Sequence, residues 1–161
     1  MGSVLPLSSH ELFDVTEQFA FNGGAKGIGE KQGLEFLKQI LKNYMNAPYL
    51  WGGKTPFGID CSGLTQMSFK LCGYMLKRDA HQQYLQGTEV GSIAEALPGD
   101  LAFFNNEKGS ITHVGIVMEN QGILHASGYV RMDKLDEKGI YREDFSNYTH
   151  NLAGIRRILK T

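Results

Sequence analysis

Residues 49–64 read Tyr49-Leu50-Trp51-Gly52-Gly53-Lys54-Thr55-Pro56-Phe57-Gly58-Ile59-Asp60-Cys61-Ser62-Gly63-Leu64, and they join a glycine-rich, aromatic loop to a segment with helical apolar periodicity. Cys61 therefore stands in the first turn of a predicted helix. The partial positive charge of a helix start favours a thiolate and is expected to lower the pKa of this cysteine. The stretch predicts a nucleophilic thiol presented at the start of a helix.

Two helices are predicted on either side of this loop. The first starts near Gln32 and ends before Pro48, because apolar side chains recur on one face at helical spacing. The second runs from Cys61 until Gly73 ends it. Cys72 lies near the end of the second helix, about 16 Å from Cys61, which excludes a disulfide between them. We therefore expect Cys72 to be a small buried residue.

Strand patterns dominate the second half of the chain. A turn at Leu97-Pro98-Gly99-Asp100 follows a short helical piece near residues 79–86 and opens onto the first strand. Charged residues scattered over 134–144 are typical of a solvated face. Because helices come first and strands joined by short turns pair antiparallel, the sequence predicts an α+β fold with N-terminal helices packed on a central antiparallel sheet. The predicted strands are residues 101–104, 113–118, 122–126, 129–133 and 154–159.

Length and composition place the chain among ordinary globular proteins. A chain of 161 residues normally forms one domain, and we expect it at residues 31–161, with residues 1–30 as an N-terminal extension or the remnant of a preceding domain. The net charge of -1 gives no reason to expect nucleic acid as a partner. No stretch approaches the roughly 20 apolar residues of a transmembrane helix, and the first residues lack the pattern of a signal peptide.

Two histidines on neighbouring predicted strands can meet if the hairpin between them has one particular register. Alternation places His113 and Gly115 on the same sheet face. A short turn centred on Asn120 sets His125 opposite Gly115 and diagonal to His113, with Cα atoms roughly 7 to 8 Å apart. At that distance two imidazoles can hydrogen-bond, and Gly115 leaves space between them. A register shifted by half a step would turn His125 to the opposite face.

Together with Cys61, these histidines predict a cysteine hydrolase. Cys61 would attack a carbonyl as the thiolate, His113 would take and return the proton, and His125 would fix the ring and tautomer of His113. Backbone N–H groups at the helix start are natural donors to the oxyanion. The arrangement requires the Cys61 helix to lie across the sheet face that carries His113. It needs no metal and no cofactor.

Other interpretations of the same residues are open at this point. Cys61, His113, His125 and Asp60 offer zinc ligands, but they lack the close paired spacing that is typical of zinc sites. A binding module without activity would usually have lost one of the three catalytic residues, and all three are present. Asp60 should raise the pKa of the neighbouring thiol unless its charge is directed elsewhere, so it either caps the helix or binds a cationic group. Three further histidines have polar surroundings and are expected at the surface: His10, His81 and His150.

Five ordered motifs resemble the NlpC/P60 family of cell-wall cysteine peptidases, and the resemblance spans about residues 33–159. The resemblance implies a papain-like NlpC/P60 fold with a Cys-His-His triad at Cys61, His113 and His125. It also implies peptidoglycan stem peptides or muropeptides as substrates, cut between γ-D-glutamate and L-lysine or meso-diaminopimelate. The motifs are Tyr49-x-Trp51-Gly52-Gly53, Asp60-Cys61-Ser62-Gly63, Gly99-Asp100-Leu101-x-Phe103-Phe104, His113-Val114-Gly115-Ile116-Val117 and His125-Ala126-Ser127.

Within that family the sequence looks most similar to the γ-D-glutamyl-L-diamino acid endopeptidases of the YkfC kind, which act on peptides with a free N-terminal L-alanine. This likeness implies that Asp60 binds the alanine ammonium, that Ser62 assists and that Tyr49 lines the site. Those relatives carry SH3-like domains before the peptidase, which implies a longer parent chain. The location implied is the bacterial cell envelope or periplasm if the protein is exported, and otherwise the cytoplasm in murein peptide recycling. An amidase or acyltransferase on the same scaffold is the alternative activity.

Overall fold

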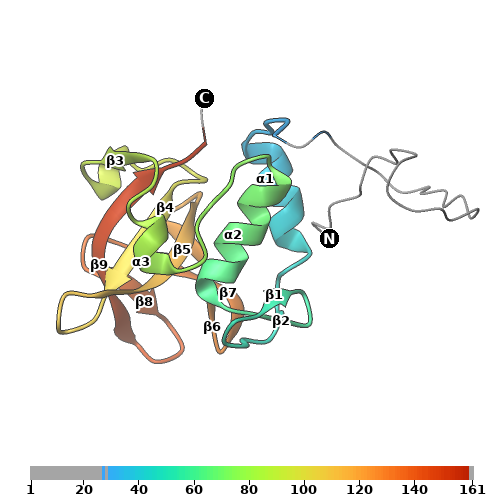
Figure 1. The fold of residues 1–161 in the computed structure, drawn as a ribbon. Coiled ribbons are helices and arrows are strands. Elements are labelled where there is room, and N and C mark those ends of the chain that lie inside the picture. The colour runs from blue at the N-terminus through green and yellow to red at the C-terminus, as the bar shows by residue number, and fades with distance from the viewer. Residues whose placement is uncertain (1–26, 28, 160–161) are drawn as a thin grey trace, which may run out of the picture.

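A computed structural model describes residue 27 and residues 29–159 of the chain. The predicted N-terminal extension lies almost entirely outside these residues, as does His10. All three α-helices precede the main sheet in the chain, as predicted (Figure 1). The helices are α1 (Leu34–Lys42), α2 (Cys61–Leu71), α3 (Ala80–Gln83) and the 3-10 helix η1 (Ile93–Glu95). The strands are β1 (Lys54–Thr55), β2 (Gly58–Ile59), β3 (Thr88–Val90), β4 (Leu101–Asn105), β5 (Ile111–Met118), β6 (Gly122–Ser127), β7 (Tyr129–Leu135), β8 (Gly139–Arg142) and β9 (Asn147–Arg157).

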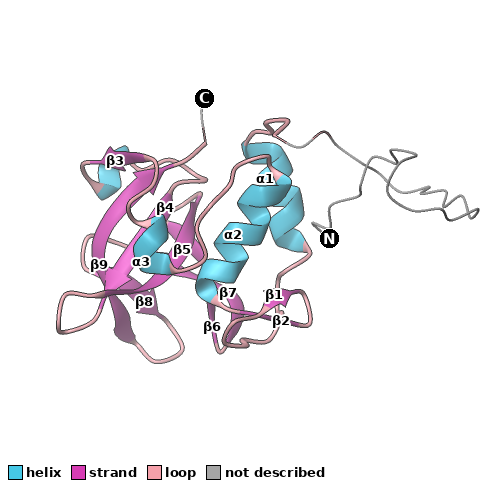
Figure 2. Cartoon of the chain, in the orientation of Figure 1, coloured by secondary structure: helices cyan, strands magenta, loops and turns pink. Residues whose placement is uncertain are grey.

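The main sheet has seven antiparallel strands in the order β3-β9-β4-β5-β6-β7-β8, and β8 also pairs with β9. This extra pairing closes the sheet into a barrel, whose strands are magenta in Figure 2. The predicted α+β class with an antiparallel sheet is confirmed. The sequence patterns did not indicate β3, β8 or the first part of β9. In β8 the reason is plain, because charged neighbours conceal two buried residues, Gly139 and Ile140, within the segment predicted as a solvated face.

The two long helices differ in how well their ends were predicted. Helix α1 ends at Lys42, earlier than its apolar pattern suggests, and a turn with Asn46 in the left-handed region (φ 63°) leaves Met45 40% exposed. Helix α2 ends where predicted, because Gly73 (φ +80°) takes the left-handed conformation that favours glycine. Cys72 is buried at that end, and neither cysteine forms a disulfide, as predicted. Within the described residues, no helix is long and apolar enough to cross a membrane.

Helix α2 packs on the opposite face of the sheet from the one predicted. Together with α1, its apolar side chains form a core with Val114 and Ile116 of the outer face of the barrel. Figure 1 shows the two helices side by side, next to the strands of the barrel. His113 alternates with these residues and points to the inner face, where Phe104 belongs to a second core. The prediction assumed an open sheet. Because the barrel closes, its own side chains fill the interior and the helices cover the outer face.

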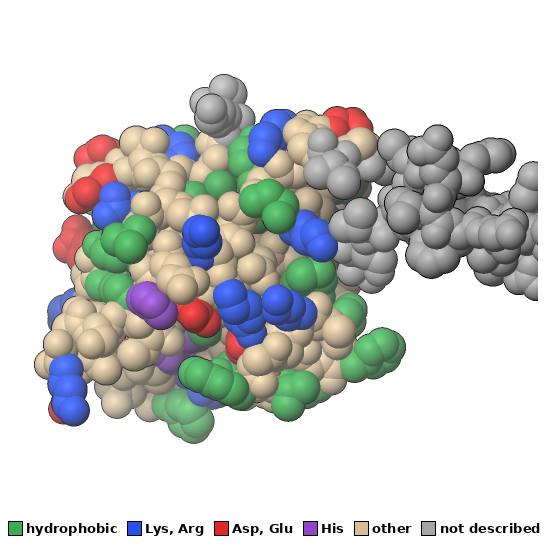
Figure 3. Space-filling view, in the orientation of Figure 1, with side chains coloured by type: hydrophobic (Ala, Val, Ile, Leu, Met, Phe, Trp, Pro, Cys, Tyr) green, Lys and Arg blue, Asp and Glu red, His purple; other side chains and the backbone are tan. Residues whose placement is uncertain are grey.

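The surface carries charges of both signs. Basic and acidic side chains are interspersed on the face seen in Figure 3, in keeping with the net charge of -1. Two aromatic side chains of the loop before Cys61 are strongly exposed, Trp51 at 84% and Phe57 at 91%. They therefore do not contribute to the core, although an aromatic-rich loop is often buried.

Candidate active site

Cys61 is held at the start of α2 by a tight contact between the helix and the loop before it. Asp60 is the N-cap residue, and its Oδ1 accepts a hydrogen bond from the backbone N–H of Gly63 at 2.6 Å. Position 63 requires glycine, because a Cβ there would lie 2.3 Å from the carbonyl oxygen of Gly53. The sequence Asp60-Cys61-Ser62-Gly63 thus encodes a capped helix start with Cys61 in its first turn. Capping, one of the two roles considered for Asp60, is present.

The Cys61 side chain is nearly buried, with 7% of the residue exposed, and its sulfur lies beside the strand that carries His113. Burial raises the pKa of the thiol, and the charge of Asp60 raises it further. Backbone N–H groups, first among them that of Val114, lower the pKa without cancelling the effect of burial. The predicted lowering of the pKa is therefore wrong for the free protein, since desolvation outweighs the helix start. The thiol is protonated at neutral pH and needs a base.

The hairpin between β5 and β6 has the register that brings two imidazoles together. Gly115 pairs with His125, as predicted. The loop between the paired residues Met118 and Gly122 is centred on Asn120, and Asn120 and Gln121 have φ angles of 55° and 56°. His113 Nε2 lies 2.8 Å from His125 Nδ1, which confirms the predicted contact. A Cβ at position 115 would lie 3.0 Å from the Cβ of His125, so glycine makes room for this arrangement.

Asp133 continues the hydrogen-bond chain behind the histidines, and the sequence reasoning missed it. Its Oδ2 lies 2.9 Å from His125 Nε2, and its Oδ1 accepts a hydrogen bond from Arg131 Nη2 at 2.8 Å. Burial raises the pKa of Asp133, but hydrogen bonds from His125 and Arg131 outweigh burial and lower it. Alternation along β7 could have indicated this residue. It puts Arg131 and Asp133 on the sheet face of His125, which pairs with Arg131.

These contacts fix the tautomer of both imidazoles. An ionised carboxylate can only accept hydrogen bonds, so His125 donates from Nε2 to Asp133. In the tautomer with this single ring proton, His125 accepts at Nδ1, and His113 donates to it from Nε2. The other nitrogen of His113, Nδ1, therefore carries a lone pair. This nitrogen is the atom of the pair that can take up a proton.

His150 also belongs to this site, and the prediction that it is a surface residue is wrong. It is half-buried on β9, and its ring stacks on that of His113 with centroids 4.2 Å apart and planes at 27°. The pairing of β8 with β9 that closes the barrel brings it there, so its polar neighbours in sequence gave no indication. Burial lowers the pKa of His150 to about 4. His81, by contrast, is exposed as predicted.

The His113 ring is neutral in the folded protein at pH 7. Burial lowers its pKa well below the ordinary value of 6.5, and the nearby charges of His150 and His125 lower it further. Phe104 covers another side of the ring, with centroids 5.8 Å apart. A neutral thiol and a neutral imidazole therefore make up the resting pair, and the proton must move when the sulfur reacts.

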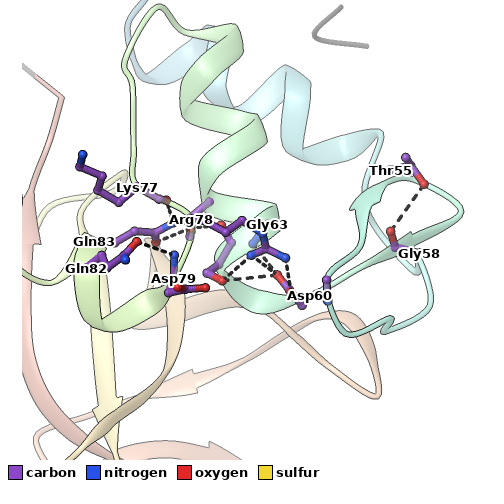
Figure 4. Close-up of polar contacts among 12 residues, drawn as sticks. Thr55, Gly58, Asp60, Gly63, Lys77, Arg78, Asp79, Gln82 and Gln83 are labelled. Atoms are coloured by element: carbon purple, nitrogen blue, oxygen red, sulfur yellow. Dashed lines mark hydrogen bonds and ion pairs between the residues drawn. The ribbon is translucent and has the colours of Figure 1, made fainter.

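Arg78 pairs with Asp60 and was not singled out in the sequence. Its Nη1 and Nη2 lie 3.0 Å and 2.5 Å from the two carboxylate oxygens of Asp60 (Figure 4). Nη1 also donates to Ser62 Oγ at 2.9 Å. Burial raises the pKa of Asp60, but Arg78 and two backbone N–H groups lower it overall. The charge of Asp60 is thus balanced by a guanidinium at the start of α2.

Tyr49 completes the surroundings of the thiol. The residue is half-buried, and its backbone N–H donates to the carbonyl of Gly128 at 2.9 Å. Burial raises the pKa of its phenol, and the charges of Cys61 and Asp60 raise it further, which places the ring within electrostatic reach of both groups. In the part of the chain that the structure describes, no group of three His, Cys, Asp or Glu side chains is arranged to hold a metal ion.

The fold and the site together define a papain-like α+β domain with a helix-borne thiol next to the strand that carries the first of two hydrogen-bonded imidazoles. Comparison with known families identifies it further. The NlpC/P60 family profile matches residues 46–149, which include Cys61, His113 and His125. The chain belongs to the NlpC/P60 family, and the resemblance seen in its motifs is confirmed.

Relatives of this chain carry the domain within longer chains. The chain is 37% identical over 133 residues to the γ-D-glutamyl-L-lysine dipeptidyl-peptidase of Bacillus subtilis, covering 77% of this chain and 45% of that protein. It is 43% identical over 112 residues to the bifunctional muramidase/DL-endopeptidase CwlT of the same organism, covering 65% and 34%. A crystal structure of an NlpC/P60 family protein from Bacillus cereus matches with a TM-score of 0.68 at 29% identity, covering 79% of this chain and 40% of that one. The chain thus spans less than half the length of these relatives.

Proposed function

We propose that this domain is a cysteine peptidase that hydrolyses the bond between γ-D-glutamate and L-lysine or meso-diaminopimelate in peptidoglycan stem peptides. Cys61 is the nucleophile, His113 is the general base and acid, and His125 orients His113. The observation that carries the proposal is the hydrogen-bond chain from Asp133 through His125 to His113. This chain leaves a basic nitrogen on His113. The backbone N–H of the next residue, Val114, reaches the Cys61 sulfur. The names of two relatives, one for the γ-D-glutamyl-L-lysine bond and one as a DL-endopeptidase, support the substrate class.

The reaction follows from the protonation states of the resting site. The thiol proton passes to His113 Nδ1 as the Cys61 sulfur attacks the γ-carbonyl of D-glutamate. His113 then gives this proton to the nitrogen of the diamino acid, and the carbon–nitrogen bond breaks to leave a thioester. Water attacks the thioester with His113 again as base, and the carboxylic acid and the free thiol are released.

Groups around the sulfur are suited to stabilise the oxyanion and to line the substrate site. The backbone N–H groups of Cys61 and Ser62 belong to the first turn of α2, where they have no partner within the helix. They are the donors that would stabilise the oxyanion of the tetrahedral intermediate. Tyr49 would line the site beside the reacting carbonyl.

Incubation with defined muropeptides tests the proposed reaction. We expect product masses that correspond to hydrolysis between γ-D-glutamate and the diamino acid. An amidase would instead separate the peptide from the sugar, and an acyltransferase would give transfer products without added water. Recovery of every substrate unchanged would contradict the proposal and favour a module that only binds.

Asp133→Asn is expected to lower kcat by about 10² to 10⁴-fold, as the loss of a correct imidazole tautomer does in related arrangements. An amide can donate to His125 Nε2, which would reverse both hydrogen bonds and place a proton on His113 Nδ1. The base would then face the sulfur in the wrong tautomer. Steady-state kinetics on a γ-D-glutamyl-L-lysine peptide measures the effect.

Asp144→Asn is the matched control for this substitution. Asp144 also pairs with Arg131, at 3.3 Å, but it is exposed and does not contact His125. We expect nearly unchanged kcat for this variant. Equal losses in the two variants would show that Asp133 contributes only through its charge near Arg131.

The acid limb of the pH profile of kcat/KM is expected below pH 6.5. His113 acts as a base only when it is neutral, so activity is present above its pKa and is lost as the pH falls through it. His150→Ala uncovers the His113 ring and removes an imidazole that becomes charged at low pH, and both changes raise the pKa of His113. The acid limb should therefore move to higher pH in this variant. His81→Ala, at an exposed histidine, should leave the profile unchanged, and an unshifted limb in His150→Ala would contradict the argument.

A further inference from the structure

We propose that Arg131 is a positioning residue of the catalytic site, which holds the Asp133 carboxylate turned toward His125 and thereby keeps His113 in the form that acts as a base. The inference rests on the proposed peptidase function and extends its hydrogen-bond chain by one side chain, at the end away from the base. Arg131 lies on β7, directly opposite His125 of β6.

The alternation of side chains along β7 places Arg131 beside its carboxylate partner. Tyr129, Arg131 and Asp133 follow one another at intervals of two residues, so they share one face of the sheet. The guanidinium carbon of Arg131 lies 5.2 Å from the centroid of the Tyr129 ring, which supports it on one side. The Arg131 side chain is only 11% exposed. A planar guanidinium supported in this way loses little freedom when it binds an anion.

The guanidinium contacts both oxygens of the Asp133 carboxylate. Arg131 Nη2 donates to Oδ1 at 2.8 Å, and Nε lies 2.8 Å from Oδ2 in an ion-pair contact without a hydrogen bond. Oδ2 is also the atom that meets His125 Nε2, at 2.9 Å. Rotation of the carboxylate would therefore disturb the contacts with Arg131 and with His125 together. The pair thus fixes the plane in which Asp133 presents Oδ2 to the histidine.

Asp144 also contacts this guanidinium, but another arginine serves it better. The Asp144 carboxylate lies 3.3 Å from Arg131 Nη1, whereas it accepts hydrogen bonds from Arg142 Nη2 at 2.5 Å and from Arg142 Nε at 3.1 Å. The Asp144 side chain is 46% exposed, and that of Asp133 is 4% exposed. An ion pair away from water is stronger than one at the surface. The pair with Asp133 is therefore the one that holds Arg131.

An open cavity borders the pair on its solvent side. Its volume is about 620 Å³, and its wall includes Arg131, Asp133, Asp144 and Lys134. Without the guanidinium, water from this cavity could reach the Asp133 carboxylate. A carboxylate that exchanges hydrogen bonds with water would hold His125 less firmly. Arg131 thus shields the end of the hydrogen-bond chain from solvent.

The charge of Arg131 also affects the pH range in which the base works. Burial raises the pKa of Asp133, but hydrogen bonds from His125 and Arg131 lower it, so the carboxylate is ionised at neutral pH. Without Arg131 this pKa rises, and the unbalanced carboxylate also favours the charged form of His113. Activity requires an ionised Asp133 and a neutral His113. Both changes therefore reduce activity as the pH falls.

No other charge near Asp133 can replace that of Arg131. Arg142 is balanced by Asp144, and the exposed Lys134 is balanced by Glu143. Cys61 and His150 are neutral at pH 7, because burial raises the pKa of the thiol and lowers that of the imidazole. The titratable and charged groups around the two ends of the hydrogen-bond chain are thus His125 on β6, Arg131 on β7, Arg142 on β8, Asp144 after β8, His150 on β9 and Cys61 on α2.

The test compares the pH profiles of kcat/KM for Arg131→Gln and the unmodified domain on a γ-D-glutamyl-L-lysine peptide. We expect kcat/KM at pH 7 to fall by about 10 to 100-fold and the acid limb to move to higher pH by about one unit. Arg131→Lys keeps the charge but lacks the planar fork, so kcat/KM should fall by only about three- to tenfold, with the limb within about 0.3 unit of its usual place. A role in stability alone would lower the unfolding temperature without moving the limb.

Arg156 on β9 offers a matched control in the same sheet. Its guanidinium carbon also lies over a tyrosine ring, 4.7 Å from the centroid of Tyr84, and it also pairs with a carboxylate, that of Glu89 at 3.2 Å. Glu89 is exposed on β3, and three strands separate β3 from β6 in the sheet. Arg156→Gln should therefore leave both kcat/KM and the acid limb unchanged.

An NMR titration of the His113 ring gives a second measurement that does not depend on turnover. We expect the pKa of His113 to rise in Arg131→Gln and to stay unchanged in Arg131→Lys and Arg156→Gln. The chain has five histidines, and the signal lost in His113→Ala identifies this one.

The outcomes separate this inference from the function on which it rests. An acid limb or a His113 titration that does not move in Arg131→Gln would overturn the inference while the peptidase function stands. An equal shift in Arg156→Gln would also overturn it, because the effect would then be one of overall charge. Failure of the unmodified domain to cleave the peptide would instead refute the proposed function, and the NMR titration would still test the role of Arg131. If Arg131→Gln does not fold, full activity in Arg131→Lys would overturn the inference.

Discussion

Cys61→Ala is expected to reduce turnover of a γ-D-glutamyl-L-lysine peptide by at least about 10⁴-fold, because no acyl-enzyme can form without the sulfur. The fold should stay intact, since the bonds of Asp60 to Gly63 and Arg78 that hold the helix start do not involve Cys61. Product formation measured by mass spectrometry gives the activity, and thermal unfolding followed by circular dichroism gives the stability. Mass spectrometry should also detect a thioester with slowly hydrolysed substrates in the unmodified domain alone.

Cys72→Ala is the matched control for the loss of a thiol. Cys72 is buried at the other end of α2, far from the loop that precedes Cys61. The substitution should cost about 1 kcal/mol of stability, as is usual for a small deletion in a core, and leave kcat nearly unchanged. Substantial activity in Cys61→Ala, or an equal loss in both variants, would rule out Cys61 as the nucleophile.

His113→Ala is expected to lower kcat by about 10³-fold or more, and His125→Ala by clearly less. In the proposed mechanism His113 carries the proton in both half-reactions, whereas His125 only fixes its tautomer and orientation through the 2.8 Å contact. Steady-state kinetics at one fixed pH above 7 measures both losses.

The exposed His81 offers a control of the same residue type, and His81→Ala should keep full activity. Losses of the same size in His113→Ala and His125→Ala, or losses in the reverse order, would contradict the assigned roles. Circular dichroism of the His125→Ala variant is needed alongside, because this residue is fully buried and its removal leaves a cavity.

The resting state of the site differs from the one that the helix start alone suggests. A thiol in the first turn of a helix is often ionised, but in this domain burial raises the pKa of Cys61 and lowers that of His113. Both effects favour the neutral pair over a thiolate–imidazolium pair. Proton transfer is therefore coupled to attack on the carbonyl, and the hydrogen-bond chain to Asp133 supplies the charge that stabilises the imidazolium as it forms.

Local rules were enough to predict the parts of the site that depend on neighbours in sequence. The cap at Asp60 and the glycine at position 63 place Cys61 in a first turn, whatever the helix later packs against. The pairing of Gly115 with His125 follows from the period-two alternation of strands and from a short turn centred on Asn120. A short hairpin has few possible registers, so its contacts could be derived in advance.

The amino-acid sequence by itself determined the helix-borne thiol, the imidazole pair and the α+β class. Only the tertiary structure decided that Arg78 balances Asp60, that His150 stacks on His113 and that α2 covers the outer face of the barrel. The physical reason is that these contacts join segments that are not neighbours in sequence; the stacking of His150 on His113, for example, exists because β8 pairs with β9 and closes the sheet. Burial likewise depends on how distant segments pack, so the directions in which the pKa values of Cys61 and His113 shift were also beyond the reach of local patterns.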